Sequence, residues 1–415
     1  MPDKKWFNLF PFYYGWVVVF TGMLGVLACL GLGRFAFGML LPSIGESLNL
    51  TYSQMGLIST GNFLGYLLSA LISGIIANRT GLRKLIYVAL MLVGFTMILS
   101  SMAQGFLYLL IMYTLTGIGS GAANIPIVSL VSSWFTKKLR GRAAGFIVAG
   151  SGFAIIFSGS FIPFMNEYIE GGEGWRSAWL VLGLMVIVIA FLCLFLLRDN
   201  PLELGLKPAG YEDNTASIRC SESVQTNQGI YRRWIIYYLG IIYFFFGYTY
   251  VIYVTFIVTA LVKERGLTEA AAGNLWSLIG FLSIFSGPLA GSLSDKCGRK
   301  TALICVFAFQ MLAYLFVAAH LPETFIYLSI VFFGLVAWSI PAIMAATVAD
   351  YTRAADTAAA FGLVTFIFGI GQITGPAVAG YMADISGSFS TSFYMATAFS
   401  AFAILLSALL QKEKT

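Results

Sequence analysis

The chain has 415 residues, of which 59% are hydrophobic and only 10% are charged. Soluble domains carry about 25% charged residues, and a soluble fold of this length cannot bury so much apolar surface. The composition therefore excludes a soluble multidomain enzyme and a disordered chain, and it predicts that most side chains face lipid.

Twelve apolar segments follow one another along the chain, and each reaches the length of about 20 residues that a membrane-spanning helix needs. They lack the short polar–apolar alternation of transmembrane β-strands. The first segment is too long for a cleaved signal peptide, and no small-x-small cleavage motif stands at its end. We therefore predict an all-α membrane protein with twelve transmembrane helices, at roughly 12–41, 53–77, 84–103, 106–134, 142–165, 176–197, 235–262, 270–293, 301–320, 324–349, 357–382 and 391–410.

The basic residues predict the orientation of these helices. With the N-terminus placed inside, 20 of the 24 Lys and Arg fall on the inner side and one, Arg34, falls within a span. Three fall outside, namely Arg176, Lys263 and Arg265. This asymmetry predicts a multi-pass protein of the cell inner membrane with both termini cytoplasmic. The net charge of +6 then reflects the basic residues on the inner side of the membrane, so we expect no nucleic-acid partner.

Residue types that carry enzymatic chemistry are scarce. None of the five cysteines forms a C-x-x-C pair, and a single histidine, His320, cannot build a metal site or a catalytic triad alone. No G-x-x-x-x-G-K-[ST] run for nucleotide phosphates is present. We therefore expect no enzyme activity, no metal and no cofactor.

The chain divides into two similar halves. A polar stretch at 198–233 predicts a mobile cytoplasmic linker between a six-helix half at 1–197 and another at 234–415. A shift of 217 residues places 50–84 over 267–301 without gaps, with identical residues at Leu50, Thr51, Gly56, Ser69, Gly74 and Gly81. Repeated halves are the layout of secondary transporters, which hold their substrate near the midplane.

The repeated loops carry a family resemblance. GIIANRTGLRK (74–84) and GSLSDKCGRK (291–300) resemble the loop signature of the major facilitator superfamily, with Asn78 and Leu82 departing from it in the first copy. FYYGWVVV (12–19), WFTKKLRGRAAG (134–145) and RDNPLELGLKP (198–208) resemble the bacterial monocarboxylate and oxalate–formate antiporter branch. GLGRFAFGMLLP (31–42) is similar to the first helix of another, largely uncharacterised bacterial group of the superfamily.

The resemblance implies that these loops gate transport. In the superfamily the loop Asp helps to latch the inner gate against the N-terminal end of a neighbouring helix, where a negative charge is favoured. Asp295 has this charge, whereas Asn78 can only form hydrogen bonds, so we expect a weaker latch in the first half. A plain topological anchor is the alternative. The expected gating residues are Gly74, Asn78, Arg79, Gly81, Arg83, Gly291, Asp295, Lys296, Gly298 and Arg299.

Arg34 is the strongest indication of a substrate. It is the one Lys, Arg, Asp or Glu deep in a predicted span, roughly seven residues or about 10 Å outward from the middle of 12–41. Buried cations are costly and usually functional. Because no acidic residue shares the membrane with Arg34, a carboxylate held by bidentate hydrogen bonds is the expected partner. Snorkelling of the guanidinium to the outer interface is the alternative.

Other polar and aromatic side chains could complete a cavity. Asn62 and Tyr66 are four residues apart and share a helix face. The remaining candidates for substrate binding are Asn124, Tyr248, Tyr253 and Gln372. Tyr113 stands where the superfamily often carries an Arg linked to proton coupling. Each of these residues has ordinary packing between helices as its alternative.

These observations predict a monomeric secondary transporter that moves a small organic anion, such as a monocarboxylate, by alternating access. Proton symport and anion exchange both remain open. Efflux of amphiphilic compounds is the second possibility, because the seventh helix is rich in aromatic residues. A membrane sensor would need a folded appendage, for which 198–233 is too short and polar.

Overall fold

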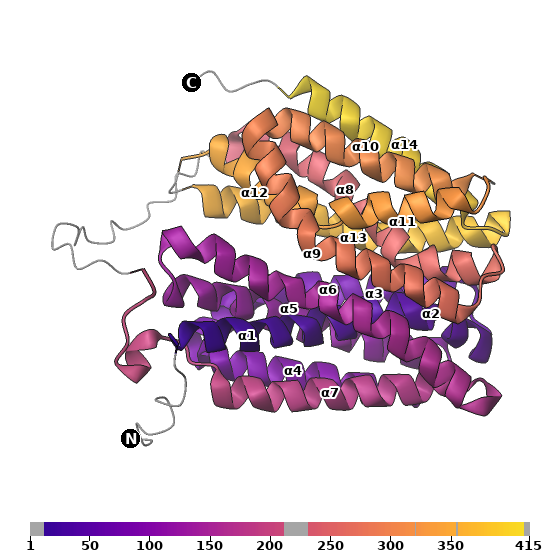
Figure 1. The fold of residues 1–415 in the computed structure, drawn as a ribbon, viewed down its shortest axis with the longest axis horizontal. Coiled ribbons are helices and arrows are strands. Elements are labelled where there is room, and N and C mark those ends of the chain that lie inside the picture. Colours follow the sequence, from indigo (N-terminus) through magenta and orange to yellow (C-terminus); the bar gives the residue numbers. More distant parts are fainter. Residues whose placement is uncertain (1–11, 211–230, 320, 354–355, 411–415) are drawn as a thin grey trace. The chain divides into compact units, whose positions relative to one another are not determined.

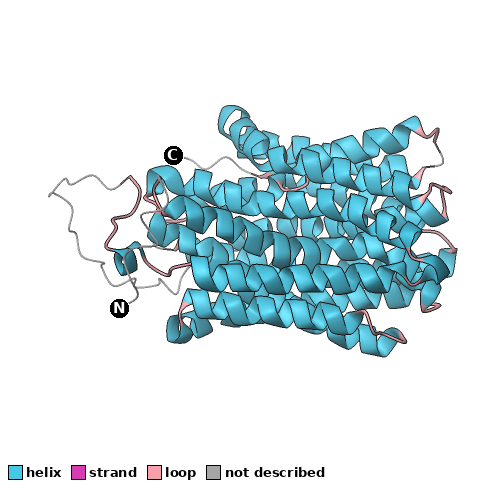
Figure 2. Ribbon diagram, turned by 60° about the horizontal axis from the view of Figure 1, so that its bottom comes forward, coloured by secondary structure: helices cyan, strands magenta, loops and turns pink. Residues whose placement is uncertain are grey.

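A computed structural model describes residues 12–210, 231–319, 321–353 and 356–410. His320 and Cys220 lie outside these residues. The described chain is almost entirely helical (Figures 1 and 2). Within the described ranges, twelve helices are long and apolar enough to cross a membrane, which confirms the predicted number of spans.

The helices are labelled as in Figure 1. The first half contains α1 (Gly15–Val26), η2 (Leu27–Phe35), α2 (Ala36–Ser47), α3 (Tyr52–Thr80), α4 (Leu82–Ser100), α5 (Phe106–Trp134), α6 (Lys137–Tyr168) and α7 (Gly174–Leu196). The second half contains α8 (Trp234–Lys263), α9 (Glu269–Cys297), α10 (Arg299–Ala318), α11 (Thr324–Val336), α12 (Ser339–Asp350), α13 (Thr357–Ser386) and α14 (Ser390–Leu409). Two short 3₁₀-helices, η3 (Glu170–Gly172) and η4 (Pro201–Leu204), lie in connections.

Two spans are not continuous α-helices. The first span, Gly15–Ser47, runs through α1, η2 and α2, and its middle segment η2 is a π-helix. The tenth span, Thr324–Asp350, is interrupted at Ala337 and Trp338 between α11 and α12. Discontinuous spans are where transporters commonly place their binding sites, because the interrupted backbone offers polar groups inside the bilayer.

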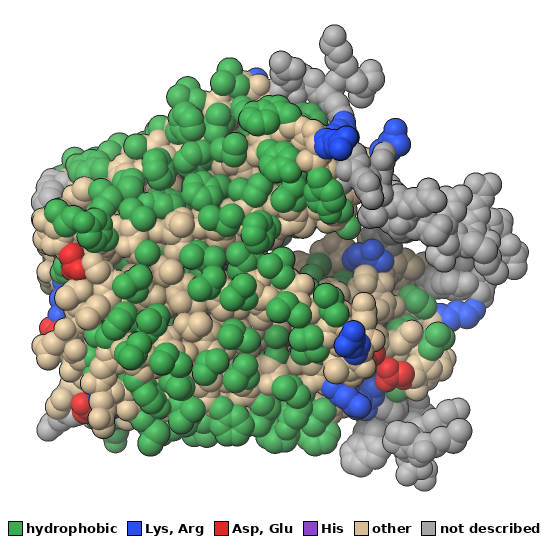
Figure 3. All heavy atoms as spheres, turned by 180° about the vertical axis from the view of Figure 1, so that it is seen from behind, with side chains coloured by type: hydrophobic (Ala, Val, Ile, Leu, Met, Phe, Trp, Pro, Cys, Tyr) green, Lys and Arg blue, Asp and Glu red, His purple; other side chains and the backbone are tan. Residues whose placement is uncertain are grey.

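The outer surface of the helices is apolar. Large hydrophobic side chains such as Phe20, Ile75, Val188, Phe195 and Leu409 are mostly exposed. Figure 3 shows hydrophobic side chains over the sides of the helices and most of the visible Lys and Arg side chains at one end. Lipid accepts such side chains, while each helix satisfies its own backbone hydrogen bonds, as the bilayer interior requires.

Contacts divide the chain into two compact units. Unit 1 contains residues 1–37 and 64–217, and unit 2 contains residues 38–63 and 218–415. Residues 38–47 of the first span and 52–63 of the second are therefore assigned to the unit that contains α8 to α14. In unit 1 the linker end is the end at which α7 finishes, and in unit 2 it is the end at which α8 begins. The opposite end of each unit is called the far end.

Small residues allow close helix contacts within each unit. In unit 1, α4 packs against α5 and α7. Gly94 of α4 and Gly183 of α7 let these two backbones approach closely, because a side chain at either glycine would collide with the carbonyl of the other. In unit 2, α13 packs along α8, where a side chain at Gly371 or Gly375 would collide with the carbonyl of Phe244 or Tyr248. These contacts agree with the close approach that small residues give to membrane helices.

The start of the predicted linker is packed against unit 1. The Trp134 indole donates to the carbonyl of Arg198 at 3.0 Å, and the Tyr13 hydroxyl donates to the carbonyl of Lys207 at 2.9 Å. Phe135 and Ala209 form a single parallel β-bridge. Residues 198–210 therefore belong to the linker end of unit 1, and the next described residue is Tyr231.

Candidate substrate-binding site

Arg34 lies closer to the middle of its span than the sequence predicts. The first span extends to Ser47 rather than to residue 41, so its midpoint is Gly31 and Arg34 lies three residues beyond it. This corresponds to a depth of about 5 Å from the midpoint instead of about 10 Å. Only 7% of Arg34 is exposed. This depth and burial favour an internal role for Arg34 over snorkelling, which needs the guanidinium at the interface.

Three of the predicted site residues meet in unit 1. The Arg34 guanidinium lies over the ring of Tyr66, 4.4 Å from its centroid, which is the geometry of a cation–π contact. The Asn124 side-chain amide donates to the Tyr66 hydroxyl at 2.9 Å. A positive charge, an aromatic face and an amide from η2, α3 and α5 thus form one cluster.

The buried charge of this cluster is distinctive. Among the described residues, Arg34 is the only Lys, Arg, Asp or Glu buried within a span. Asp356, the other buried charged residue in the described ranges, precedes α13 at the linker end. A single basic side chain, that of Arg34, is thus buried within the described spans. This arrangement can bind an anion.

Asn62 is buried one helical turn before Tyr66 on α3. The two residues lie on opposite sides of the division between units, since unit 1 resumes at Leu64. The binding role of Asn62 therefore stays a prediction.

The predicted residues of unit 2 do not form one cluster. The Tyr248 hydroxyl donates to the sulfur of Met395 at 3.4 Å, and the Tyr253 hydroxyl is 2.8 Å from the hydroxyl of Ser329. Tyr248 therefore points toward α14 and Tyr253 toward α11. The amide of Gln372 donates instead to the hydroxyl of Tyr250.

Tyr250 and Trp338 are residues that the sequence analysis left out of its site. Their ring centroids are 6.0 Å apart, and Trp338 stands at the interruption of the tenth span. The backbone N–H of Trp338 donates to the hydroxyl of Ser286 at 3.1 Å, which satisfies one polar group at this break. The Ile340–Pro341 step was the available signal, because proline disfavours a continuous helix.

The two loop copies share a backbone geometry. Gly81 has φ +87° and ψ 151°, and Gly298 has φ +84° and ψ 155°. This region is essentially restricted to glycine. Both loops therefore need their matched glycine to turn from one helix into the next, which supports the internal repeat at the level of the main chain.

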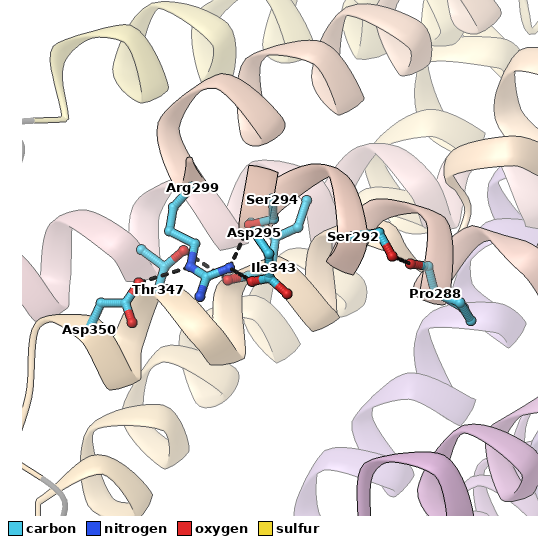
Figure 4. Close-up of polar contacts among 8 residues, drawn as sticks. All are labelled: Pro288, Ser292, Ser294, Asp295, Arg299, Ile343, Thr347 and Asp350. Atoms are coloured by element: carbon cyan, nitrogen blue, oxygen red, sulfur yellow. Dashed lines mark hydrogen bonds and ion pairs between the residues drawn. The ribbon is translucent and has the colours of Figure 1, made fainter. Parts of the chain in front are cut away.

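The second loop copy is built around Arg299. Its side chain bonds Asp295 at 2.6 Å, Ser294 at 2.9 Å and Asp350 of α12 at 2.8 Å (Figure 4). Asp295 thus has Arg299 as its immediate partner, and its contact with a helix N-terminus stays a prediction. Several residues of the predicted gating set are exposed or half-buried, namely Gly74, Asn78, Arg79, Gly291 and Lys296. The network joins α9, α10 and α12 at the linker end of unit 2.

The first loop copy receives its carboxylate from outside the loop. Asp199 accepts a hydrogen bond from the backbone N–H of Arg83 at 2.7 Å, in the first turn of α4. A carboxylate at a helix N-terminus is favourable. Asp199 therefore places a negative charge beside the copy in which Asn78 replaces the superfamily aspartate. The Asn200–Pro201 turn was the available signal for this ordered segment.

Charged contacts also gather at the far end of unit 2. Lys263 at the end of α8 forms an ion pair with Glu46 at the end of α2. Asp384 accepts from the backbone N–H groups of Tyr52 and Ser53, at 2.8 and 2.9 Å, in the first turn of α3. A pocket of about 540 Å³ that is open to the surface is lined by residues that include Glu46, Tyr52, Lys263 and Asp384. The sequence analysis had assigned Lys263 only to the outer side.

Comparison with known proteins agrees with this architecture. Residues 26–410 match the family described as uncharacterised MFS-type transporter YbfB. The protein therefore belongs to this family within the major facilitator superfamily, which confirms the superfamily resemblance seen in the loops. The family and the relatives below are transporters rather than enzymes.

The relatives carry organic anions, as their names state. The chain is 25% identical over 410 residues to the hexuronate transporter of Bacillus subtilis, covering 94% of this chain and 92% of the relative. It is 23% identical to the Homo sapiens monocarboxylate transporter 2, covering 94% and 82% of the two chains. It is 25% identical to the probable sulfoacetate transporter SauU of Cupriavidus necator, covering 86% and 85%.

Solved structures show the same fold. A bacterial homologue of the human lysosomal transporter Spinster, described as inward-facing and unoccupied, matches with a TM-score of 0.75 and 15% identity, covering 96% of this chain and 97% of that one. The nucleoside transporter NupG matches with a TM-score of 0.75 and 12% identity, covering 94% and 98%. The chain is thus a multi-pass membrane protein with the major facilitator fold.

Proposed function

We propose that this protein is a secondary transporter of a small organic anion with a carboxylate group, such as a monocarboxylate. It works by alternating access in the cell inner membrane, with both termini cytoplasmic, as a proton symporter or an anion exchanger. The observation that carries the proposal is the buried Arg34 guanidinium beside Tyr66 and Asn124. The named relatives support the substrate class, because hexuronate, monocarboxylates and sulfoacetate are all organic anions.

The chemistry of the three side chains suits a carboxylate. The planar guanidinium can donate two parallel hydrogen bonds to its two oxygens. The face of the Tyr66 ring contacts the Arg34 guanidinium, and the hydrogen bond from Asn124 orients the Tyr66 hydroxyl. A charged hydrogen bond of this kind contributes about 1.5–3 kcal/mol, so losing one should weaken affinity by about 10- to 150-fold.

Substitutions of Arg34 test this proposal. Arg34→Lys keeps the charge and loses the bidentate geometry, whereas Arg34→Gln keeps polar atoms and loses the charge. We expect weakened uptake of radiolabelled carboxylates into proteoliposomes for the lysine variant and nearly none for the glutamine variant. The assay is run with and without a pH gradient, which separates proton symport from exchange.

Arg176→Gln provides a matched control. Arg176 donates to the carbonyls of Ser101 and Ala103 beyond the end of α4, so its loss should lower stability without changing carboxylate affinity. Wild-type carboxylate affinity in Arg34→Gln would contradict the anion site. Efflux of amphiphilic compounds that survives in Arg34→Gln would then favour the second function, for which the aromatic α8 was the sequence signal.

A further inference from the structure

The π-helix of the first span sets the direction of Arg34. In η2 the backbone N–H of Ala36 bonds to the carbonyl of Gly31, five residues earlier, instead of four. A π-helical segment therefore holds an extra residue compared with an α-helix over the same path. Because each α-helical residue turns the chain by about 100°, a return to the α-helical register would rotate Arg34 by about that angle.

Two side chains from α5 contact the carbonyls of this π-helix. The Ser120 hydroxyl donates to the carbonyl of Cys29 at 2.7 Å, and the Tyr113 hydroxyl donates to the carbonyl of Arg34 at 2.9 Å. Cys29 and Arg34 are five residues apart, the interval of one π-helical hydrogen bond. Local π adjustments persist inside membranes when neighbouring side chains satisfy the affected backbone groups. Ser120 and Tyr113 therefore hold the two ends of one π turn.

Tyr113 is itself held firmly. It is buried, with its ring centroid 4.4 Å from that of Phe37 and 5.9 Å from that of Trp179. Aromatic contacts of this kind fix the ring, so the hydroxyl has a defined position. The hydroxyl bonds the main chain of the same residue whose guanidinium lies over Tyr66. Tyr113 is thus linked to the orientation of Arg34 through the backbone.

We propose that Tyr113 is a positioning residue for the anion site: its hydroxyl holds η2 in the π-helical register that places the Arg34 guanidinium over Tyr66. Ser120 supports the other end of the same turn. The inference rests on the proposed function for the identity of the ligand, whereas the effect on the helix register is independent of any ligand. Tyr113 acts through Arg34 and does not contact the anion itself.

The test removes one hydroxyl. Tyr113→Phe keeps the ring and removes the hydroxyl that bonds the carbonyl of Arg34. The control is Tyr14→Phe, because Tyr14 is also buried in unit 1 and donates to a backbone carbonyl, that of Leu196, at 2.8 Å. Two measurements are made on purified protein: lactate uptake in proteoliposomes, which gives KM and turnover, and amide hydrogen exchange in the peptide 27–36.

We expect Tyr113→Phe to raise KM by about three- to tenfold, which is the effect of one hydrogen bond, with turnover nearly unchanged. Exchange in 27–36 should accelerate. Tyr14→Phe should change neither quantity. In the Arg34→Lys background, Tyr113→Phe should raise KM by a clearly smaller factor, because residues that act through one another are not additive.

Two results overturn the inference. One is unchanged exchange in 27–36 for Tyr113→Phe, whatever is transported. The other is a rise in KM that is as large for Tyr14→Phe as for Tyr113→Phe, or a rise for Tyr113→Phe that is as large in the Arg34→Lys background as in the wild type. A general structural effect gives either pattern. If wild-type protein carries no carboxylate, the proposed function fails, and the exchange measurement alone decides whether Tyr113 holds the π register.

Discussion

Glu46 and Lys263 form an ion pair, and they are 217 residues apart, which is the offset that superimposes 50–84 on 267–301. They are equivalent positions at the ends of the first helices of the two halves. Opposite charges at these two equivalent positions make their contact within unit 2 attractive.

This pair predicts a charge-swap experiment. Glu46→Lys and Lys263→Glu each place like charges together, and we expect each to change the rate of carboxylate uptake by about two- to fivefold, since exposed ion pairs contribute up to about 1 kcal/mol. The double variant Glu46→Lys/Lys263→Glu should recover most of the wild-type rate. The control is Glu323→Lys, an exposed far-end charge outside this pair. A double variant no better than the single reversals would show that the pair does not contribute to transport.

We expect Asp199 to contribute more than Asn78 to the stability of the protein at the first loop copy. Its carboxylate bonds the first turn of α4, whereas Asn78 is exposed. Asp199→Asn should lower the free energy of unfolding by about 1 kcal/mol because it weakens a charged helix cap. Asn78→Ala should stay within about 0.5 kcal/mol of wild type. Thermal unfolding of the purified variants measures both, and a larger loss in Asn78→Ala would contradict this assignment.

The second loop copy should matter more for transport than the first. Asp295→Asn removes a charge from the Arg299 network that joins α9, α10 and α12. We expect a shift of the conformational equilibrium by about 1 kcal/mol, or about fivefold, and a matching fall in uptake rate. Arg299→Gln should be at least as impaired, because Arg299 also bonds Asp350. Near-wild-type uptake in both Asp295→Asn and Asn78→Ala would refute the latch.

Cys297 tests the predicted orientation. It is an exposed free thiol at the end of α9, in the loop expected on the cytoplasmic side. In a variant that retains Cys297 as its single cysteine, a membrane-impermeant maleimide should label inverted vesicles and leave intact cells unlabelled. Glu323→Cys, placed between α10 and α11 in a background without other cysteines, should label in intact cells. The reverse pattern would invert the topology.

The sequence by itself determined the spans and the family. Long apolar segments must become helices in lipid, because only a helix satisfies its own backbone hydrogen bonds there. Most predicted boundaries consequently lie within a few residues of those observed. The first span was predicted six residues too short at its end because Pro42, Ser43 and Glu46 resemble a helix end, although they continue α2 to Ser47. Arg34 was identifiable because a charge in an apolar segment is rare.

Only the tertiary structure decided how these residues meet. A membrane helix can be apolar on every face, so its sequence does not say which face turns toward a neighbour. The alternating tyrosines of α8 illustrate this: Tyr250 bonds Gln372, whereas Tyr248 and Tyr253 turn toward α14 and α11. The π-helical register that places Arg34 over Tyr66 likewise depends on Tyr113 and Ser120, about 80 to 90 residues away in sequence. Such contacts follow from packing between distant segments, which local patterns do not encode.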